Sequence, residues 1–155
     1  AYNTSAPVIS FENASRHENF NFSNNIFLGS GQMISGTNTG SSFVGNVWWS
    51  PVAGLKLMKY ASLDDWVRAS GQEMLNGKIV GLQVDPGLKG PFLTELTDPY
   101  RLNELTGYTL KPESPIRNKG IDLRGFPGFE PPSRDFFGNP VPEGEVPEPG
   151  IYEIK

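Results

Sequence analysis

The sequence predicts an all-β fold in which short coils stack on one another. Residues 22–27 (Phe-Ser-Asn-Asn-Ile-Phe) recur 21 positions later as residues 43–48 (Phe-Val-Gly-Asn-Val-Trp), and residues 8–10 are echoed by residues 33–35. Repeats of roughly 20–25 residues cannot bury their own apolar face, so they stack on their neighbours. The chain also contains 18 Gly and 14 Pro among its 155 residues, so turns should outweigh helix.

Residues 1–60 are predicted to form the coils. Their only charged side chains before Lys56 are Glu12, Arg16 and Glu18, and most of their polarity comes from Asn, Ser, Gly and Thr. Apolar runs with strand character are separated by Gly or Asn. These runs are residues 8–11, 20–22, 26–28, 42–44 and 55–58.

Asn25 and Asn46 occupy equivalent places in two of these coils. Asn tolerates left-handed backbone angles and bonds to its own backbone in tight turns. We therefore expect the two side chains to stack as a ladder along one edge of the coils. The alternative is that they are two unrelated turn residues.

Residues 61–80 contain the one convincing helix and a connection. Ser62 is placed to cap the helix, and Gly71 is placed to end it. Asp64 and Asp65 fall in the first turn, where the helix dipole favours acids. We prefer this explanation of the two aspartates to a metal or acid pair. One apolar stripe is expected at Leu63, Trp66 and Val67.

Residues 81–155 are predicted to follow an extended path with little regular structure. Nine of the 14 Pro come after Lys111, and Pro restricts the backbone and lowers the entropy of the unfolded chain. We expect this segment to be a cap within the same domain that blunts the strand edge of the last coil. Its expected anchors are Phe126, Phe129, Phe136, Phe137 and Tyr152.

Charge and composition exclude several classes of partner. The formal net charge is −4 and the pI is near 5.0, which argues against nucleic acid and anionic membranes. No apolar run approaches the ~18 residues of a membrane-spanning helix. The chain has no Cys, which excludes disulfides and thiolate metal sites. It starts at Ala1 without Met or an apolar leader, so we expect any secretion signal to lie upstream or to have been removed.

Several segments along nearly the whole chain resemble the C-terminal end of secreted right-handed parallel β-helix (pectate-lyase-like) proteins. They are residues 24–27, 45–49, 62–66, 84–86, 108–115 and 134–140. That superfamily commonly ends in Ser-Pro-Ala-Ile-Asp-Ala-Gly, then Asp-Phe-Xaa-Gly-Asn-Pro, then Asp-Ile-Gly-Ala-Tyr-Glu. Here residues 114–120 carry Asn118 where Asp is usual, and residues 148–153 have Glu-Pro in place of Asp-Ile.

The resemblance implies the last coils of a right-handed parallel β-helix, one short α-helix and an irregular Pro/Gly-rich cap. Members of the superfamily are typically carbohydrate-active, so it implies a piece of a secreted or periplasmic glycoside hydrolase or polysaccharide lyase. The partners would be a polysaccharide or oligosaccharide and the preceding β-helix coils, expected as a separate chain of the same parent protein. Most catalytic residues would lie on those coils. Two alternatives stay open: a non-catalytic glycan-binding or structural end-cap, and an unrelated β-rich protein with accidental repeats.

One loop of the coil region contains the residue types that carbohydrate chemistry needs. Glycoside hydrolysis uses two carboxyl groups, and a lyase uses a base together with a cation that steadies developing charge. Glu12, His17 and Glu18 are therefore the catalytic candidates, with Arg16 as a substrate-binding candidate. His17 is the only histidine of the chain. The alternative, which we favour, is a solvated charged turn.

Adjacent tryptophans suggest a second substrate contact. Trp48 and Trp49 should point to opposite faces of a strand, so one fills the core. Trp49 could then serve as a platform for a sugar ring, with Tyr60 and Lys59 near the same groove. The alternative is that Trp49 stacks beneath Trp66 or under the C-terminal segment. We find no metal motif and expect no cofactor, although a calcium ion shared with further coils stays open.

Overall fold

The computed structural model describes residues 2–3, 5–12, 18–37, 40–52, 54–93, 97–141, 143–144 and 146–155. The contacts between residues divide the chain into two compact units, Ala1–Asp85 and Pro86–Lys155. Regular structure in the described residues is mostly β-strand, with two short helices. The predicted all-β class is therefore confirmed.

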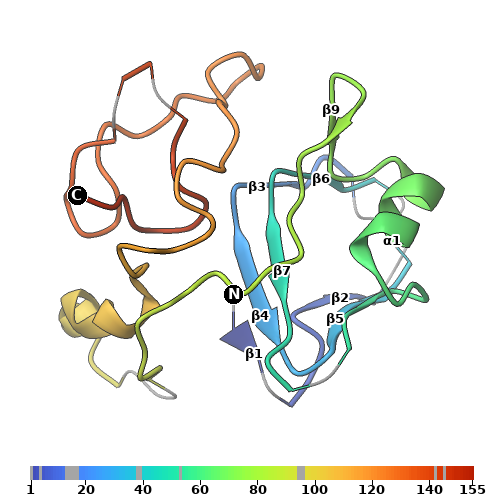
Figure 1. Cartoon of the computed structure of the whole chain (residues 1–155), viewed down its shortest axis with the longest axis horizontal. Helices are drawn as coiled ribbons and strands as arrows, with labels where there is room; N and C mark the ends of the chain where they lie inside the picture. Colours follow the sequence, from blue (N-terminus) through green and yellow to red (C-terminus); the bar gives the residue numbers. More distant parts are fainter. Residues whose placement is uncertain are drawn as a thin grey trace. The chain divides into compact units, whose positions relative to one another are not determined.

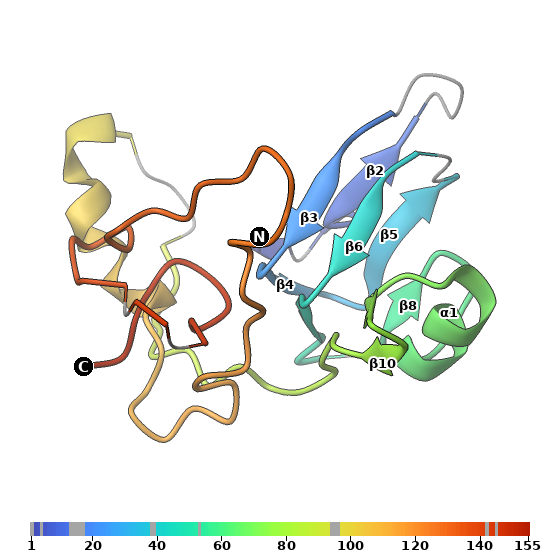
Figure 2. The ribbon, with the colours of Figure 1, turned by 90° about the horizontal axis from the view of Figure 1, so that it is seen from above.

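The strands of the first unit visit three sheets in rotation (Figures 1 and 2). The first sheet contains β1 (Tyr2–Asn3), β4 (Ile26–Gly29) and β7 (Val47–Trp49). The second contains β2 (Ile9–Phe11), β5 (Gln32–Gly36) and β8 (Lys56–Leu57). The third contains β3 (Asn21–Ser23) and β6 (Ser42–Val44). Every strand pair within these three sheets is parallel.

The strand register confirms both sequence repeats. Phe22 pairs with Phe43, which is the expected shift of 21 positions, and Ile9 pairs with Ile34, as the shorter echo predicts. Equivalent side chains consequently lie on top of one another. The rings of Phe22 and Phe43 stack at 4.6 Å between centroids, and those of Phe27 and Trp48 stack at 4.4 Å.

The predicted helix is α1 (Leu63–Ser70), and it packs on this aromatic core. The Ser62 side chain accepts a hydrogen bond from the Asp65 amide, and Gly71 ends the helix with a left-handed φ of 70°. The Trp66 ring contacts those of Phe43 and Trp48 at 5.5 and 5.6 Å. Burying a large apolar side chain of this kind contributes roughly 1.5–3 kcal/mol. The core cluster contains Phe11, Phe27, Met33, Ile34, Phe43, Trp48, Leu55, Leu57, Leu63, Trp66 and Val67.

A partial third turn of chain lies against β7. Strands β9 (Met74–Leu75) and β10 (Lys78–Ile79) form an antiparallel hairpin, after which Leu82 pairs in parallel with Val47. The Leu82 amide donates to the Asn46 carbonyl at 2.9 Å, just as the Val47 amide donates to the Asn25 carbonyl at 2.8 Å. Residues 81–85, which the sequence analysis grouped with the C-terminal segment, therefore continue the coil pattern of the first unit.

The second unit is largely irregular, as its proline content predicts. The one helix among its described residues is the 3-10 helix η2 (Pro99–Tyr108), which was not predicted from the sequence. Asp98 caps it, and Pro99 begins it, so the start signal was present in the sequence. Leu110, Ile116 and Ile121 are buried. The cap role expected for this unit stays a prediction.

Candidate functional site

The turns that join the third sheet to the first carry the predicted asparagine ladder. Asn24 has a φ of 54° and Gly45 a φ of 72°, so both turns use a left-handed residue at the same place. The following residue then directs its side-chain amide along the stack. The backbone N and Nδ2 of Asn25 both donate to Asn46 Oδ1, at 2.9 and 3.0 Å. The stacked arrangement, and not the pair of unrelated turns, is therefore correct.

The ladder ends in a carboxyl group. The backbone N and Nδ2 of Asn46 donate to the two oxygens of Glu73 at 3.0 and 2.8 Å, and Trp48 Nε1 donates to the same carboxyl at 2.9 Å. Glu73 is fully buried. Burial raises the pKa of Glu73, and the donors on Asn46 and Trp48 offset part of that rise. A carboxylate accepts hydrogen bonds but has no N–H or O–H group to donate to a further residue. Glu73 therefore terminates the ladder.

The other end of the ladder is open. Among the hydrogen bonds of the described residues, none is donated to Asn25 Oδ1. Within the same residues, β2 pairs only with β5, and β3 pairs only with β6. We call β3 and Asn25 the open rung. Among the described residues, β3 pairs on one side only, and together with the Asn25 acceptor it forms a candidate interface.

Uncharged polar pairs follow the outside of the same strands. Ser35 Oγ donates to Ser10 Oγ at 3.1 Å, and Ser42 Oγ donates to Asn21 Oδ1. Both pairs are exposed. Hydroxyl and amide groups of this kind can exchange hydrogen bonds with a neutral polyol such as a sugar.

The predicted catalytic loop is tested only at its two ends. Glu12 and Glu18 are described and exposed, whereas Arg16 and His17 lie outside the described residues. The structure therefore neither brings these four candidates together nor separates them. Their roles stay predictions.

The tryptophan pair behaves as predicted in part. Trp48 is fully buried and Trp49 is partly exposed, which agrees with the expected opposite faces. The ring that contacts Trp66 is that of Trp48, and no ring contact between Trp49 and Trp66 occurs among the described residues. The alternative in which Trp49 lies under the C-terminal segment stays a prediction. Tyr60 is half-buried against the core, and the Lys59 Nζ lies 5.3 Å from its ring centroid. No ring contact between Trp49 and Tyr60 occurs among the described residues.

The second unit contains an acidic cluster that sequence reasoning missed. Asp135 Oδ1 accepts from the amides of Phe137 and Asn139, while its Oδ2 accepts from Asn139 Nδ2 and the Glu153 amide, all within 2.9 Å. Burial raises the pKa of Asp135, but these donors together hold it below its ordinary value. Burial and then the neighbouring Glu148 raise the pKa of Glu153 to about 8.

This cluster does not suit glycoside hydrolysis. Glu148 and Glu153 are both buried, and their carboxyl groups are hydrogen-bonded to each other. The two carboxyls of a glycosidase stand about 5–9.5 Å apart to admit the sugar. We therefore assign the Glu148–Glu153 pair a structural role. The sequence offered one signal for it, because residues 148–153 had been singled out by their resemblance to a terminal β-helix element.

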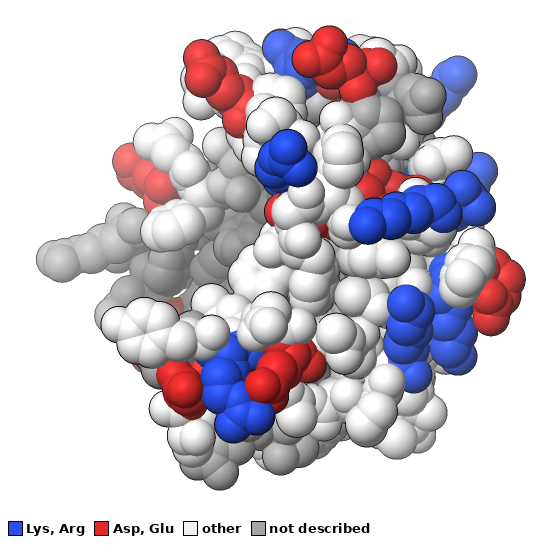
Figure 3. All heavy atoms as spheres, turned by 90° about the vertical axis from the view of Figure 1, so that its left-hand side faces the viewer, with Lys and Arg blue, Asp and Glu red and all other residues white. Residues whose placement is uncertain are grey.

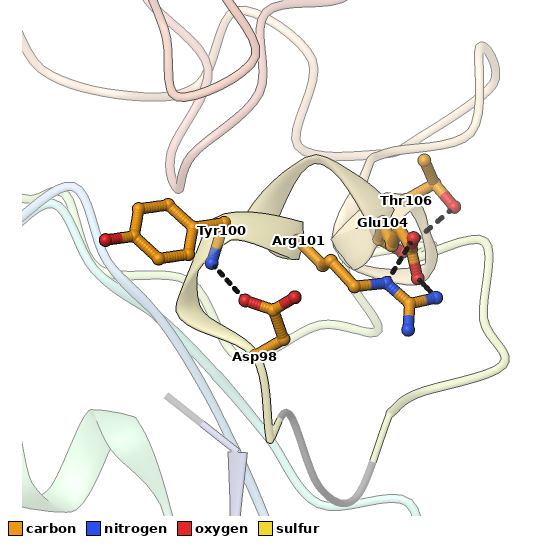
Figure 4. A network of polar contacts seen from close by, with 5 residues as sticks. All are labelled: Asp98, Tyr100, Arg101, Glu104 and Thr106. Atoms are coloured by element: carbon orange, nitrogen blue, oxygen red, sulfur yellow. Dashed lines mark hydrogen bonds and ion pairs between the residues drawn. The ribbon is translucent and has the colours of Figure 1, made fainter.

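The exposed polar groups near η2 form short-range surface contacts (Figure 4). Arg101 pairs with Glu104 at 2.6 Å, and Asp98 accepts from the Tyr100 amide at 2.9 Å. The Tyr100 side chain is 94% exposed. On the face shown in Figure 3, basic and acidic side chains are spread among uncharged surface.

Three further observations concern metal binding, membrane-spanning helices and similarity to known proteins. The described residues contain no group of three or more His, Cys, Asp or Glu suited to a metal ion. Within that part of the chain, no helix is both long and apolar enough to cross a membrane. No family model, curated protein or solved structure matches this sequence.

Proposed function

We propose that this chain is the C-terminal portion of a secreted, polysaccharide-degrading right-handed parallel β-helix protein, either a glycoside hydrolase or a polysaccharide lyase. The observation that carries the proposal is the rotation of parallel strands through three sheets in register. Right-handedness follows from the strong general preference of parallel crossovers. The sequence resemblance points to the same architecture.

The chain contributes the end of the coil stack, and the reaction centre lies mainly on coils beyond the open rung. Two features support this division. The ladder terminates at Glu73, after which the β9–β10 hairpin and Leu82 follow, while on the opposite side β3 pairs only with β6 among the described residues. In addition, the described residues of this chain contain no accessible carboxyl pair with a displaced pKa.

A non-catalytic glycan-binding or structural end-cap is the second candidate. It is favoured by the exposed Ser10–Ser35 and Asn21–Ser42 pairs and by the partly exposed Trp49. An indole ring and uncharged donors recognise a sugar without performing chemistry on it.

A panel of acidic and neutral polysaccharides separates the two candidates. Binding, release of reducing ends and formation of unsaturated sugar would be measured with the chain alone. We expect binding without turnover, lost in Trp49→Ala and kept in Tyr100→Ala, a matched change of another exposed aromatic. Turnover that His17→Ala or Glu18→Ala abolishes would place the reaction centre in this chain. If the chain neither bound nor turned over any glycan of the panel, that result would contradict the proposed carbohydrate activity.

A further inference from the structure

We propose that Asn76 is a site of spontaneous modification, at which its side chain cyclises with the Gly77 nitrogen and reopens as an isoaspartyl or aspartyl link. The site is the two-residue turn between β9 and β10, and this turn projects beyond the parallel strands of the first unit (Figure 1). The inference does not depend on the proposed carbohydrate function.

The turn holds the only Asn-Gly pair of the sequence. The backbone nitrogen that follows an Asn can close a five-membered ring on the side-chain amide carbon. A side chain on the following residue crowds this approach, and Gly has none. The space around Gly77 is also open, because a Cβ built there would have no heavy atom of the described residues within 4 Å beyond its chain neighbours. Asn76 and Gly77 are therefore the pair best suited to cyclise.

The reaction needs only base and water. The Gly77 nitrogen loses its proton to base and forms a bond to Asn76 Cγ. The Cγ–Nδ2 bond breaks, and the leaving nitrogen takes up a proton from water and departs as ammonia. A water molecule then opens the succinimide ring. Attack at the backbone carbonyl leaves an isoaspartyl link, and attack at Cγ leaves Asp. No group is oxidised or reduced.

The hairpin around this turn opens at low cost. Strands β9 and β10 are two residues long and, in the described part of the chain, pair only with each other. A two-stranded hairpin is marginally stable by itself. Met74 and Ile79 face each other across the strands and are 36% and 45% exposed, so little apolar burial holds the strands together. Opening releases Asn76 and Gly77 from φ values of 50° and 76° and lets the ring close.

Asn118 provides a matched comparison in the second unit. It is exposed, and its φ of 54° is close to that of Asn76. The next residue is Lys119, whose side chain crowds the approach to the amide carbon. The Lys119 amide also donates to the Ile116 carbonyl at 3.1 Å, which occupies the nitrogen that would attack. Asn118 should therefore persist under conditions in which Asn76 reacts.

An isoaspartyl link disrupts the turn but leaves the ladder terminator in place. The link adds a carbon to the backbone and replaces a neutral amide with a carboxylate, and a two-residue turn with both φ values positive does not accommodate the longer backbone. Glu73 precedes β9 and is held independently, because its carboxyl accepts from Asn46 and Trp48. We therefore expect the hairpin to lose its pairing while the ladder keeps its end.

Ageing of the full chain at neutral and mildly alkaline pH tests the proposal. The measurements are ammonia release, peptide mass spectrometry and labelling by an isoaspartyl methyltransferase. Modification should be at least ~10-fold faster at Asn76 than at Asn118 and should accelerate with hydroxide concentration. Asn76→Gly keeps a residue suited to positive φ but has no amide to lose, so its labelling at this turn should be absent.

Amide hydrogen exchange of the purified isoaspartyl form measures the structural effect. The amides of Leu75 and Lys78, which pair on either side of the turn, should exchange at least ~10-fold faster than in fresh protein, and that of Asn46 should be unchanged.

Equal rates at Asn76 and Asn118 would overturn the proposal. So would an Asn76 that stays intact in the folded chain and reacts only after urea unfolds it, because the closed turn would then protect the amide. Unchanged exchange at Leu75 and Lys78 in the isoaspartyl form, or faster exchange at Asn46, would overturn the effect assigned to the link.

Discussion

Asn46 Nδ2 lies 2.8 Å from Glu73 Oε1, and this bond joins a repeating ladder to a residue outside the repeat. The ladder would otherwise present the donors of Asn46 and Trp48 to the interior without an acceptor. A buried donor without a partner costs about 1–3 kcal/mol. Glu73 is therefore a structural terminator, and the first predictions concern it.

Replacing Glu73 should destabilise the first unit. Glu73→Gln turns an NH2 group toward incoming N–H donors and should cost about 1–3 kcal/mol, and Glu73→Ala, which leaves three donors unpaired, about 3 kcal/mol or more. Urea unfolding followed by tryptophan fluorescence measures both. Glu12→Gln, a matched change at an exposed acid, should stay within ~0.5 kcal/mol. Equal effects of the Gln changes at residues 73 and 12 would refute the terminator role.

Gly36 should not tolerate a side chain. Its φ is 80°, and a Cβ there would lie 2.0 Å from the Phe11 carbonyl oxygen, where β2 and β5 pair. Gly36→Ala should therefore cost about 3 kcal/mol or more. Gly71→Ala has a similar φ of 70° but open space around the new Cβ, so it should cost only about 1 kcal/mol. Thermal unfolding of the two variants would show the difference, and equal losses would mean that the close approach is absent.

The Glu148–Glu153 pair should make the second unit less stable as pH rises. The folded pKa of Glu153, about 8, lies above its ordinary value of 4.5, so the folded state retains a proton that the unfolded state has lost. The stabilising contribution is complete below pH 4.5 and is lost as pH rises through about 8. The methyl NMR signals of Ile116 and Ile121 report unfolding of this unit. Glu153→Gln should flatten the pH profile, and an unchanged profile would contradict the raised pKa of Glu153.

Asp135 should show the opposite pH dependence. Its folded pKa lies below the ordinary value of 3.8, so its contribution is present above that pH and is lost on further acidification. Asp135→Asn places an NH2 group among four N–H donors and should cost about 1–3 kcal/mol by the same methyl signals. Asp122→Asn is the control, because Asp122 pairs with Arg124 at an exposed site, where solvent screening should make the loss of stability much smaller. Similar losses in both variants would argue against the donor cluster.

The local features of the first unit could be predicted from the sequence because they repeat. The 21-residue shift predicts the pairing of Phe22 with Phe43 and the stacking of Asn25 on Asn46. The cap at Ser62 and the stop at Gly71 depend on neighbouring residues only, so the limits of α1 could also be predicted.

The remaining contacts depend on segments that do not repeat. Glu73 lies 27 positions after Asn46, and the hairpin before Leu82 interrupts the repeat, so no spacing points to it. The meeting of Asp135 with Glu153 is set by an irregular path of 18 residues. Such pairings follow from long-range packing, which local propensity does not encode.

Amide hydrogen exchange of the unmodified chain tests the stacked ladder most directly. We predict slow exchange at Asn25 and Asn46, whose amides donate to Asn46 and Glu73, and fast exchange at Ser23 on the outer edge of β3. Exchange at Asn25 and Asn46 as fast as at the exposed Thr37 would contradict the ladder and, with it, the coil architecture on which the proposed function depends.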